Sequence, residues 1–274
     1  MRLTRLYVGR ELRSGSSIEL PPEAAAHVAR VLRARSGDEV VLFNGGGGEF
    51  AAVVETVRAG RVTLAVGAGR DVERESPLAV TLIQCVPRGD RMDLIVQKTV
   101  ELGVARIVPV VSQRGVVRID QTQAESKAAH WRAIAVGACE QCGRNRLPRI
   151  DAVRPLLDHL GASDPGRSAR QSWVLEPDAG PPDRAAWPDR GAPADPSASP
   201  DPAAAPDQAV ATGRGAVPRE VHVAVGPEGG FTPDELEAFR VAGFALIGLG
   251  PRVLRTETAA IAVLTWLQAQ FGDM

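Results

Sequence analysis

Apolar, strand-like segments alternate with helical patterns along most of the chain beyond residue 73. Buried-type strands joined by helices are typical of a parallel sheet, because two parallel strands need a long crossover connection between them. Residues 73–274 are therefore predicted to form a mostly parallel α/β domain. The expected strands are 79–83, 106–111, 172–175, 221–225 and 245–249, and the expected helices are 90–102, 121–142 and those that start at Thr232 and after Arg255.

The first 72 residues follow another pattern. Short strand-like runs at 39–43, 50–55 and 61–66 are separated by the tetraglycine Gly45–Gly48 and by a turn at Ala59-Gly60. Short strands with glycine turns between them are typical of a small β-barrel, with the tetraglycine at a hairpin tip. One helical pattern, opened by Pro22-Glu23 and running to Leu32, completes this predicted domain, and a polar stretch at 71–77 marks its boundary.

Residues 177–218 interrupt the α/β pattern. They hold 10 of the 21 prolines and no Leu, Ile or Phe, so they cannot bury enough apolar surface to offset their ordering entropy. We expect a flexible insertion in the second domain, with a proline-rich ligand for a partner as the alternative.

The composition indicates a cellular compartment and is compatible with a nucleic-acid partner. The chain lacks a run of roughly 20 apolar residues, a secretory signal and enough cysteines for a disulfide framework, so we expect a cytoplasmic protein without contact to a membrane. The formal charge is −1, but residues 88–149 hold 11 basic against 6 acidic side chains. A local positive surface attracts phosphates whatever the net charge.

A glycine-rich turn stands between the strand at 221–225 and the following helix. Gly226, Gly229 and Gly230 permit backbone conformations closed to other residues and let a ligand approach the chain. Thr232 suits the N-cap, Pro233 the first helical position and Glu235 the reciprocal capping position. No phosphate-loop or dinucleotide-binding motif is present, and Glu228 would repel phosphate, so either a non-phosphate ligand or a plain strand-to-helix turn fits.

A second strand-to-helix junction carries two arginines, Arg252 and Arg255, in its loop. Thr256 or Thr258 is expected to cap the last helix, whose apolar face must be buried and comprises Ala260, Ile261, Val263, Leu264, Leu267 and Phe271. Two glycine-containing junctions at the carboxyl ends of strands predict a ligand crevice in the α/β domain.

Charged and amide side chains crowd the end of the long helix, from Glu140 to Pro148. A solvated helix end is the simpler interpretation of this cluster. Cys139 and Cys142 form a C-x-x-C pair without a second pair, and the four histidines show no ligand spacing, so neither a metal site nor dithiol chemistry is favoured. No G-x-S-x-G element supports a serine nucleophile.

Taken together, these motifs resemble the RsmE family of 16S rRNA (uridine-N3) methyltransferases, which belong to the SPOUT class. The residues that carry the resemblance are Gly226-Pro227-Glu228-Gly229-Gly230, Leu249-Gly250-Pro251-Arg252-Val253-Leu254-Arg255-Thr256-Glu257-Thr258-Ala259, His27 to Arg33, Gln97 to Gly103, and Glu140-Gln141 with Arg144. The resemblance spans nearly the whole chain apart from the proline-rich insertion and the stretch just before it.

The resemblance implies a SPOUT-type knotted, mostly parallel α/β domain at 73–274, preceded by a small PUA-like β-barrel at 1–72. It also implies a homodimer, a 16S rRNA or small-subunit substrate, and S-adenosyl-L-methionine held by the knot loops. The implied cofactor-binding residues are Leu175, Glu176, Gly226, Pro227, Glu228, Gly229, Gly230, Leu249, Gly250, Arg252, Leu254, Arg255, Thr256, Glu257, Thr258 and Ala259.

The implied reaction methylates uracil N3, which carries a proton at neutral pH, on the pairing edge of a base that must be unpaired. A guanidinium cannot accept that proton but favours the uracil anion, so Arg144, or alternatively Arg255, is the catalytic candidate. Glu140 is a weaker candidate for proton acceptor. A structural salt bridge is the alternative role of Arg144.

Basic residues of the barrel, Arg10, Arg30 and Arg33, are candidate phosphate contacts, and His27 belongs to the same candidate RNA-binding set. A solvated basic face is the alternative. For the whole chain, the alternatives are a noncatalytic RNA-binding protein with a degenerate knot and a nucleotide-binding enzyme of ordinary doubly wound fold.

Overall fold

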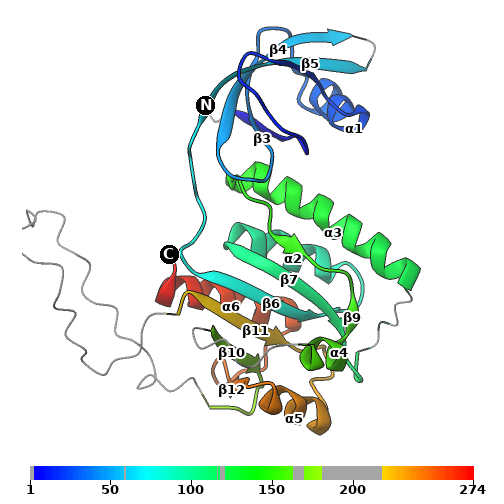
Figure 1. Cartoon of the computed structure of the whole chain (residues 1–274). Helices are drawn as coiled ribbons and strands as arrows, with labels where there is room; N and C mark the ends of the chain where they lie inside the picture. Colours follow the sequence, from blue (N-terminus) through cyan, green and yellow to red (C-terminus); the bar gives the residue numbers. More distant parts are fainter. Residues whose placement is uncertain (1–2, 59, 116, 118–120, 163–169, 181–217) are drawn as a thin grey trace, which may run out of the picture. The chain divides into compact units, whose positions relative to one another are not determined.

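The computed structural model describes residues 3–58, 60–115, 117, 121–162, 170–180 and 218–274, which form two compact units (Figure 1). The first unit combines residues up to Glu75 with Arg88–Val108 and Ile119–Val153. The second combines Ser76–Pro87, Pro109–Arg118 and Arg154–Met274. Most of the predicted insertion at 177–218 lies outside the described residues.

A five-stranded sheet forms the N-terminal part of the first unit, with the strand order β1-β3-β4-β5-β2. The β1–β3 pair is parallel and the other pairs are antiparallel. Its inner face buries the apolar side chains of alternate positions, such as Val62, Leu64 and Val66 in β5. The strands are β1 (Thr4–Tyr7), β2 (Ser17–Glu19), β3 (Glu39–Phe43), β4 (Glu49–Arg58) and β5 (Arg61–Arg70). The three predicted strands are confirmed, whereas β1 and β2 are too short to show a pattern in the sequence.

The predicted helix at 22–32 is only partly correct. An α-helical turn, α1 (Pro22–Ala26), widens into a π-helical turn over His27–Val31. Arg33 then adopts a left-handed conformation with φ 51°, which ends the helical segment.

The tetraglycine forms the predicted connection between β3 and β4 and has a second role. Gly45 and Gly46 form β-bridges with Arg146, and the Gly47 amide donates to the Asn145 carbonyl at 3.2 Å. Gly47 has φ +107°, a conformation that favours glycine, and a Cβ there would lie 2.8 Å from the Arg146 guanidinium. The tip therefore docks on the segment that follows the long helix.

Two helices complete the first unit, α2 (Arg91–Glu101) and α3 (Gln121–Cys142), both at the predicted places. Asp93 of α2 accepts hydrogen bonds from Trp131 Nε1 at 3.2 Å and pairs with His130, both on α3. The short strand β8 (Arg149–Ile150) pairs in parallel with β7 (Val104–Val111), which runs from the first unit into the second.

Parallel strands form the centre of the second unit, in the order β12-β10-β11-β6. These strands are β6 (Ala79–Cys85), β10 (Arg170–Leu175), β11 (Glu220–Val225) and β12 (Ala245–Ile247); β9 (Arg154–Pro155) pairs with the end of β7. Because β10 lies between β11 and β12, the loops that leave the carboxyl ends of these three strands are neighbours. The predicted parallel α/β architecture is confirmed, and the knot stays a prediction.

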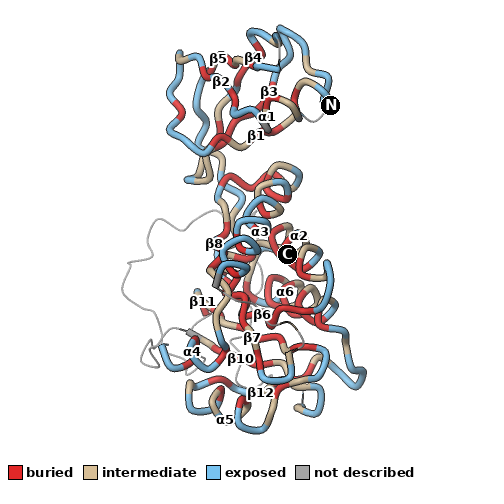
Figure 2. Tube along the Cα trace, turned by 90° about the vertical axis from the view of Figure 1, so that its right-hand side faces the viewer, coloured by how far each residue is buried: buried red, intermediate tan, exposed pale blue. Residues whose placement is uncertain are grey.

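Three helices accompany this sheet: α4 (Leu156–Gly161), α5 (Pro233–Val241) and α6 (Thr256–Phe271). Helix α6 packs on β6 and β11, and Figure 2 shows its buried face. Val263, Leu264 and Leu267 are completely buried, as the apolar pattern predicts. No helix in the described part of the chain is long and apolar enough to cross a membrane.

Candidate active site

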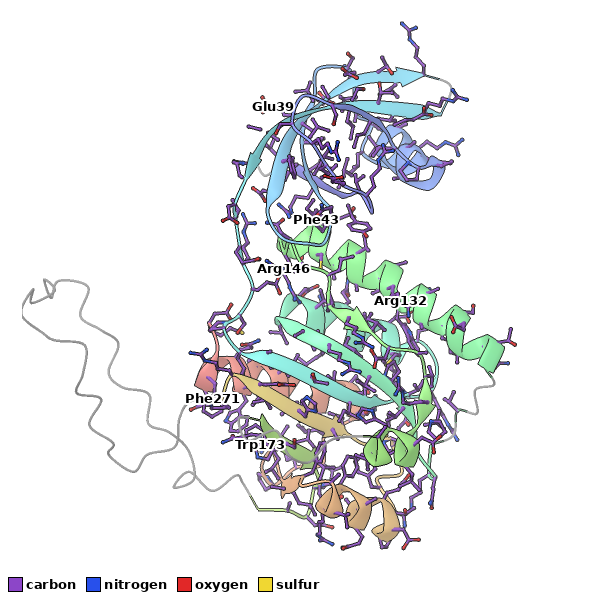
Figure 3. All side chains as sticks on the ribbon, in the orientation of Figure 1. Glu39, Phe43, Arg132, Arg146, Trp173 and Phe271 are labelled. Carbon is purple, nitrogen blue, oxygen red and sulfur yellow. The ribbon has the colours of Figure 1, made fainter. Side chains whose placement is uncertain are left out.

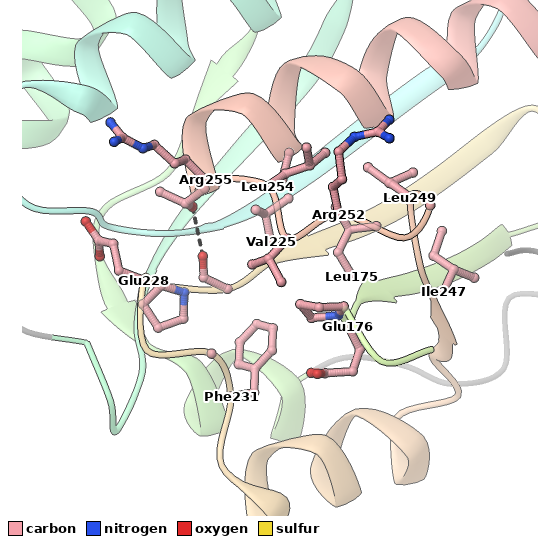
Figure 4. A pocket seen from close by; sticks show the side chains of 18 residues that line it. Leu175, Glu176, Val225, Glu228, Phe231, Ile247, Leu249, Arg252, Leu254 and Arg255 are labelled. Atoms are coloured by element: carbon pink, nitrogen blue, oxygen red, sulfur yellow. Dashed lines mark hydrogen bonds between the residues drawn. The ribbon is translucent and has the colours of Figure 1, made fainter. Parts of the chain in front are cut away.

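A cavity of about 270 Å³ opens in the second unit where the loops after β10, β11 and β12 meet the start of α6 (Figure 4). This is the carboxyl edge of a parallel sheet, the usual place for a ligand in such folds. The lining residues come from the ends of these strands and from both predicted junctions: Leu175, Glu176, Pro177, Val225, Gly226, Pro227, Glu228, Gly230, Phe231, Ile247, Leu249, Gly250, Arg252, Val253, Leu254, Arg255, Thr256 and Ala259.

The glycine-rich turn forms one wall and is fixed by the helix that follows it. Thr232 is the N-cap of α5, and Glu235 completes the predicted capping box by accepting from the Thr232 amide at 2.9 Å. The second carboxylate oxygen of the fully buried Glu235 accepts a hydrogen bond from the backbone amide of Gln113 at 2.7 Å. Gly230 has φ +67°, a conformation that glycine adopts without strain. The capping prediction is confirmed, and Glu235 also ties the turn to the loop after β7.

Phe231 supplies an aromatic surface beneath the turn. Its ring packs edge-on against Phe239, with 5.0 Å between ring centroids, and Phe239 packs in turn against Phe244 at 5.1 Å. A Cβ at Gly226 would lie 3.1 Å from the Phe231 ring, so the glycine lets the ring and the backbone come together.

The loop after β10 approaches the end of β12 very closely. The Glu176 amide donates to the Ile247 carbonyl at 3.0 Å, and the Gly248 amide donates to the Gly180 carbonyl at 2.9 Å. A Cβ at Gly248 would lie 2.2 Å from the Ala179 carbonyl oxygen, so no larger residue fits without a shift of the backbone. This contact holds Glu176 at the pocket.

The predicted capping of α6 by Thr256 or Thr258 is wrong. Arg255 is the N-cap residue, without a side-chain capping bond. The Thr256 hydroxyl instead donates to the Gly226 carbonyl at 2.8 Å and accepts from Gln84 Nε2 at 2.9 Å. Thr256 and Gln84 are buried, and a buried carbonyl or amide without a hydrogen-bond partner destabilises the fold. The Thr256 hydroxyl therefore links the glycine-rich turn to β6 and does not cap the helix.

Ionisable side chains of both signs surround an apolar interior. Leu175, Val225 and Ile247 contribute apolar surface between the strands, whereas Glu228, Arg252 and Arg255 are exposed at the edge (Figure 4). Arg252 and Arg255 extend from the loop that precedes α6. The pocket therefore offers apolar, cationic and anionic contacts to one ligand.

Most of the predicted cofactor-binding residues line this pocket; Gly229, Glu257 and Thr258 do not. Gly229 lies against Arg114, whose Nη1 donates to the Gly229 carbonyl at 3.3 Å and to the Phe231 carbonyl at 3.1 Å. The predicted residue set omits Pro177, Val225, Phe231, Ile247 and Val253. Val225 and Ile247 end their strands, so the same rule that located the crevice could have found them.

Arg144 and Glu140 lie in the first unit, at the end of α3, where both make structural contacts. Arg144 is 5% exposed; Nε donates to Glu75 at 3.0 Å, Nη2 bonds the other Glu75 oxygen, and Nη1 donates to the carbonyls of Val100 and Val104. Burial disfavours the charged guanidinium, but the Glu75 carboxylate outweighs it and raises the pKa of Arg144. Glu140 Oε1 accepts from the Tyr7 amide at 2.9 Å. The geometry favours the salt-bridge role of Arg144, and its catalytic role stays a prediction.

Arg144 belongs to a larger ion-pair network in the first unit. Arg5 Nη1 donates to the buried Glu49 carboxylate at 2.6 Å, and the Arg5 guanidinium also bonds Asn145 Oδ1. Arg74 pairs with Glu49 at 3.3 Å and donates to the Gly143 carbonyl at 2.9 Å. Burial opposes ionisation of Glu49, but the hydrogen bonds from Arg5 and Arg74 prevail and lower its pKa. The network joins the N-terminal strands to the end of α3.

The candidate RNA-binding residues lie in the first unit. Arg10, Arg30 and Arg33 are exposed, and Arg10 Nη2 donates to the Glu19 carbonyl at 2.8 Å. His27 starts the π-helical turn. Their contact with RNA stays a prediction.

The cysteines show no geometry for redox or metal chemistry. Burial raises the pKa of both the Cys85 and the Cys139 thiol to about 12, so both are protonated at neutral pH; Cys142 is half-buried. Within the described residues, no cluster of three or more His, Cys, Asp and Glu side chains could hold a metal ion.

Two family models match the chain. The RNA methyltransferase domain matches residues 74–176 and 200–268, and the RNA methyltransferase PUA domain matches residues 20–66. The fold and the pocket thus belong to the class of RNA methyltransferases that carry an N-terminal PUA domain.

Solved structures and sequence relatives narrow this class. A methyltransferase from Legionella pneumophila in complex with S-adenosylmethionine is 35% identical, with a TM-score of 0.82 and full coverage of both chains. Ribosomal RNA small subunit methyltransferase E from Neisseria gonorrhoeae, bound to S-adenosylmethionine, is 31% identical, with a TM-score of 0.80 and again full coverage of both chains. The enzyme of the same name from Buchnera aphidicola is 29% identical over 100% of this chain and 98% of its own length. The chain belongs to the ribosomal RNA small subunit methyltransferase E family.

Proposed function

We propose that this protein transfers a methyl group from S-adenosylmethionine to N3 of a uridine in 16S rRNA of the small ribosomal subunit. The observation that carries the proposal is the convergence of the glycine-rich turn and the two-arginine loop on one pocket at the carboxyl edge of the sheet. Relatives that cover the whole chain and were solved with S-adenosylmethionine support it.

The residues of the pocket fit that cofactor chemically. The apolar interior formed by Leu175, Val225 and Ile247 suits a flat adenine ring, and backbone amides and carbonyls of the glycine-rich turn lie beside it. Glu176 and Glu228 favour a sulfonium and an ammonium group, while Arg252 suits a carboxylate. The same acidic side chains disfavour a triphosphate, so the pocket should discriminate against ATP.

When bound, S-adenosylmethionine supplies an electrophilic methyl group on a positively charged sulfur. The protein must hold an unpaired uracil with N3 in line with that methyl group, and such alignment alone contributes roughly 7–11 kcal/mol in favourable cases. It must also favour loss of the N3 proton. We assign the stabilisation of the uracil anion to Arg255, because its permanent charge is exposed at the edge of the pocket. The guanidinium of Arg144 is held by Glu75 and two carbonyls, which makes it the second candidate.

Calorimetry with S-adenosylmethionine and with ATP tests the cofactor assignment. We expect saturable binding of S-adenosylmethionine alone. Binding of ATP alone would favour the nucleotide-binding alternative, and binding of neither together with tight RNA binding would favour a noncatalytic RNA-binding protein.

The position of methylation is tested in cells that lack the gene. Mass analysis of their 16S rRNA should show one uridine without its N3-methyl group, restored by the wild-type gene. A full set of methylated uridines would contradict the proposal. The homodimer that the family resemblance implies and the cytoplasmic location expected from the composition stay predictions.

A further inference from the structure

A second concave site lies within the first unit, apart from the residues assigned to methyl transfer. It encloses about 510 Å³ and is lined by Tyr7 of β1, by Arg132 and Val136 of α3, and by Leu147, Pro148 and Arg149 of the segment that leads into β8. Figure 3 shows Arg132 on α3. The site therefore combines an aromatic ring, apolar side chains and two arginines.

The tetraglycine explains how the aromatic ring reaches this site. A Cβ at Gly45 would lie 3.0 Å from Leu147 Cγ and 3.4 Å from the Tyr7 ring, so the bare glycine lets both side chains approach the backbone here. The ring also packs at a tilt on Phe43, 5.7 Å between centroids, and the Tyr7 amide is held by Glu140. The chain's single tyrosine thus has a fixed backbone and a ring that is still partly exposed.

The charges at the site are distributed unevenly between its surface and its interior. The Asp151 carboxylate pairs with Arg149 at 2.8 Å and also with Arg106 at 2.5 Å, so one acid is shared by two arginines. The Asp151 side chain is only 1% exposed, whereas that of Arg149 is 70% exposed. Arg132 donates to the neutral Ile150 carbonyl at 3.1 Å and is exposed as well. Positive charge faces solvent, and the balancing carboxylate is buried.

We propose that this site binds one nucleotide of a single-stranded RNA segment, with its base on the Tyr7 ring and its phosphate at Arg149 and Arg132. An aromatic ring beside exposed arginines is the combination that binds single-stranded nucleic acid, because every base has a face that stacks and every nucleotide carries a phosphate. The inference rests on the proposed function, which requires an RNA substrate, and adds a contact outside the methyl-transfer pocket.

Photo-crosslinking tests the location of the contact. The full-length protein is irradiated with a short single-stranded RNA that contains 5-iodouridine, and the crosslinked peptides are identified by mass spectrometry. We expect a crosslink at Tyr7, which is unambiguous because the chain has no other tyrosine. Crosslinks confined to peptides that contain neither Tyr7 nor residues 132–150 would overturn the proposal.

Binding of the same RNA to variants tests the chemistry. Stacking is worth about 1–3 kcal/mol per base, so Tyr7→Leu should weaken RNA binding roughly 5- to 140-fold, whereas Tyr7→Phe should keep wild-type affinity. Arg149→Gln should reduce the slope of log Kd against log salt by about 0.7, the value for one phosphate contact of a single strand. The matched control is Arg240→Gln, which removes another exposed arginine with an acidic neighbour, in the second unit.

Two outcomes decide the proposal. The site is supported if RNA binding weakens in Tyr7→Leu and Arg149→Gln and stays at the wild-type level in Tyr7→Phe and Arg240→Gln. Unchanged Kd and salt slope in Arg149→Gln, in which the buried Asp151 keeps its pairing with Arg106, overturns it even if Tyr7→Leu is unstable. Because none of these substitutions alters the methyl-transfer pocket, S-adenosylmethionine affinity measured in parallel reports separately on the proposed function.

Discussion

The Thr256 hydroxyl lies 2.8 Å from the Gly226 carbonyl oxygen and joins two segments that are 30 residues apart in the sequence. The same hydroxyl accepts from Gln84 at the end of β6, so one side chain connects the glycine-rich turn, the start of α6 and a central strand. Both sides of the pocket depend on this connection, so a substitution of Thr256 tests how the site is held together.

Thr256→Val should therefore reduce both stability and cofactor binding. It removes the hydroxyl at nearly constant volume and leaves the Gly226 carbonyl and the Gln84 amide without this partner, at a cost of about 1–3 kcal/mol in the free energy of unfolding. Denaturant unfolding and calorimetry with S-adenosylmethionine measure the two effects. Thr265→Val in the same helix is the control, because the Thr265 hydroxyl donates within its own helical turn, to the Ile261 carbonyl at 2.9 Å. Equal losses in both variants would contradict the role of Thr256.

Gly248→Ala should disrupt the pocket through the backbone. The new methyl group would lie 2.2 Å from the Ala179 carbonyl, and relief of that overlap must displace the loop that carries Glu176. Overpacking costs typically 1–3 kcal/mol, so S-adenosylmethionine affinity should fall about fivefold or more. Gly161→Ala is the matched control, since a Cβ there meets no atom within 4 Å. Wild-type affinity in Gly248→Ala would show that this close approach is not needed for binding.

Substitution of Arg144 should mainly lower stability, whereas substitution of Arg255 should mainly lower the rate of methyl transfer. Arg144→Ala leaves Glu75 without its buried partner and should lower the free energy of unfolding by about 3–5 kcal/mol. The double variant Arg144→Met with Glu75→Gln should recover much of that loss, because neither charge remains. Arg255→Ala should leave stability nearly unchanged and reduce single-turnover methyl transfer.

Single-turnover rates at saturating S-adenosylmethionine decide between the two arginines. If the stabilised double variant at Arg144 and Glu75 transfers methyl groups at the wild-type rate, Arg144 is structural. If that variant is inactive while Arg255→Ala is fully active, the catalytic assignment moves from Arg255 to Arg144.

Acid should weaken the first unit through Glu49. Its pKa is lowered in the folded protein from an ordinary value of 4.5, so the folded state holds its proton less tightly than the unfolded state does. The stabilisation is complete above that ordinary value and is lost as the pH falls through the folded pKa. Unfolding free energies measured from neutral pH down to about pH 3 should therefore show the difference between wild type and Glu49→Gln shrinking with acidification. A difference that stays constant with pH would exclude this linkage.

Local pattern predicted much of the architecture, and tertiary contacts account for the errors. The alternation of apolar runs and helical patterns located β6, β7, β10, β11 and the helices α2, α3, α5 and α6. A strand buried on both faces is a continuous apolar run, as in β6, and a helix repeats its apolar positions at the helical period. The strands β1, β2, β8 and β9 have two to four residues, too few for a period to be visible. The Thr256 assignment failed because a threonine at a helix start has the right side chain for capping, and only the buried Gly226 carbonyl shows that it is used elsewhere.

The sequence predicted which loops form the site, but not which side chains pack or hydrogen-bond with one another there. Both loops at the carboxyl ends of strands line the pocket, as their position implied. The contribution of Phe231 was hidden, because it depends on packing against Phe239 and Phe244 and not on a motif. The contacts of Arg144 with Glu75, Val100 and Val104 join residues separated by 40 or more positions, which no local pattern encodes.

Because the three cysteines are unequally buried, one of them can be labelled selectively. With the pKa of Cys85 and Cys139 raised to about 12, neither forms much thiolate near neutrality, whereas Cys142 is accessible at the last residue of α3. A maleimide dye added to the unmodified protein should attach at that single position, beside the buried ion pairs of the first unit. Fluorescence from such a label would follow RNA docking without any engineered cysteine.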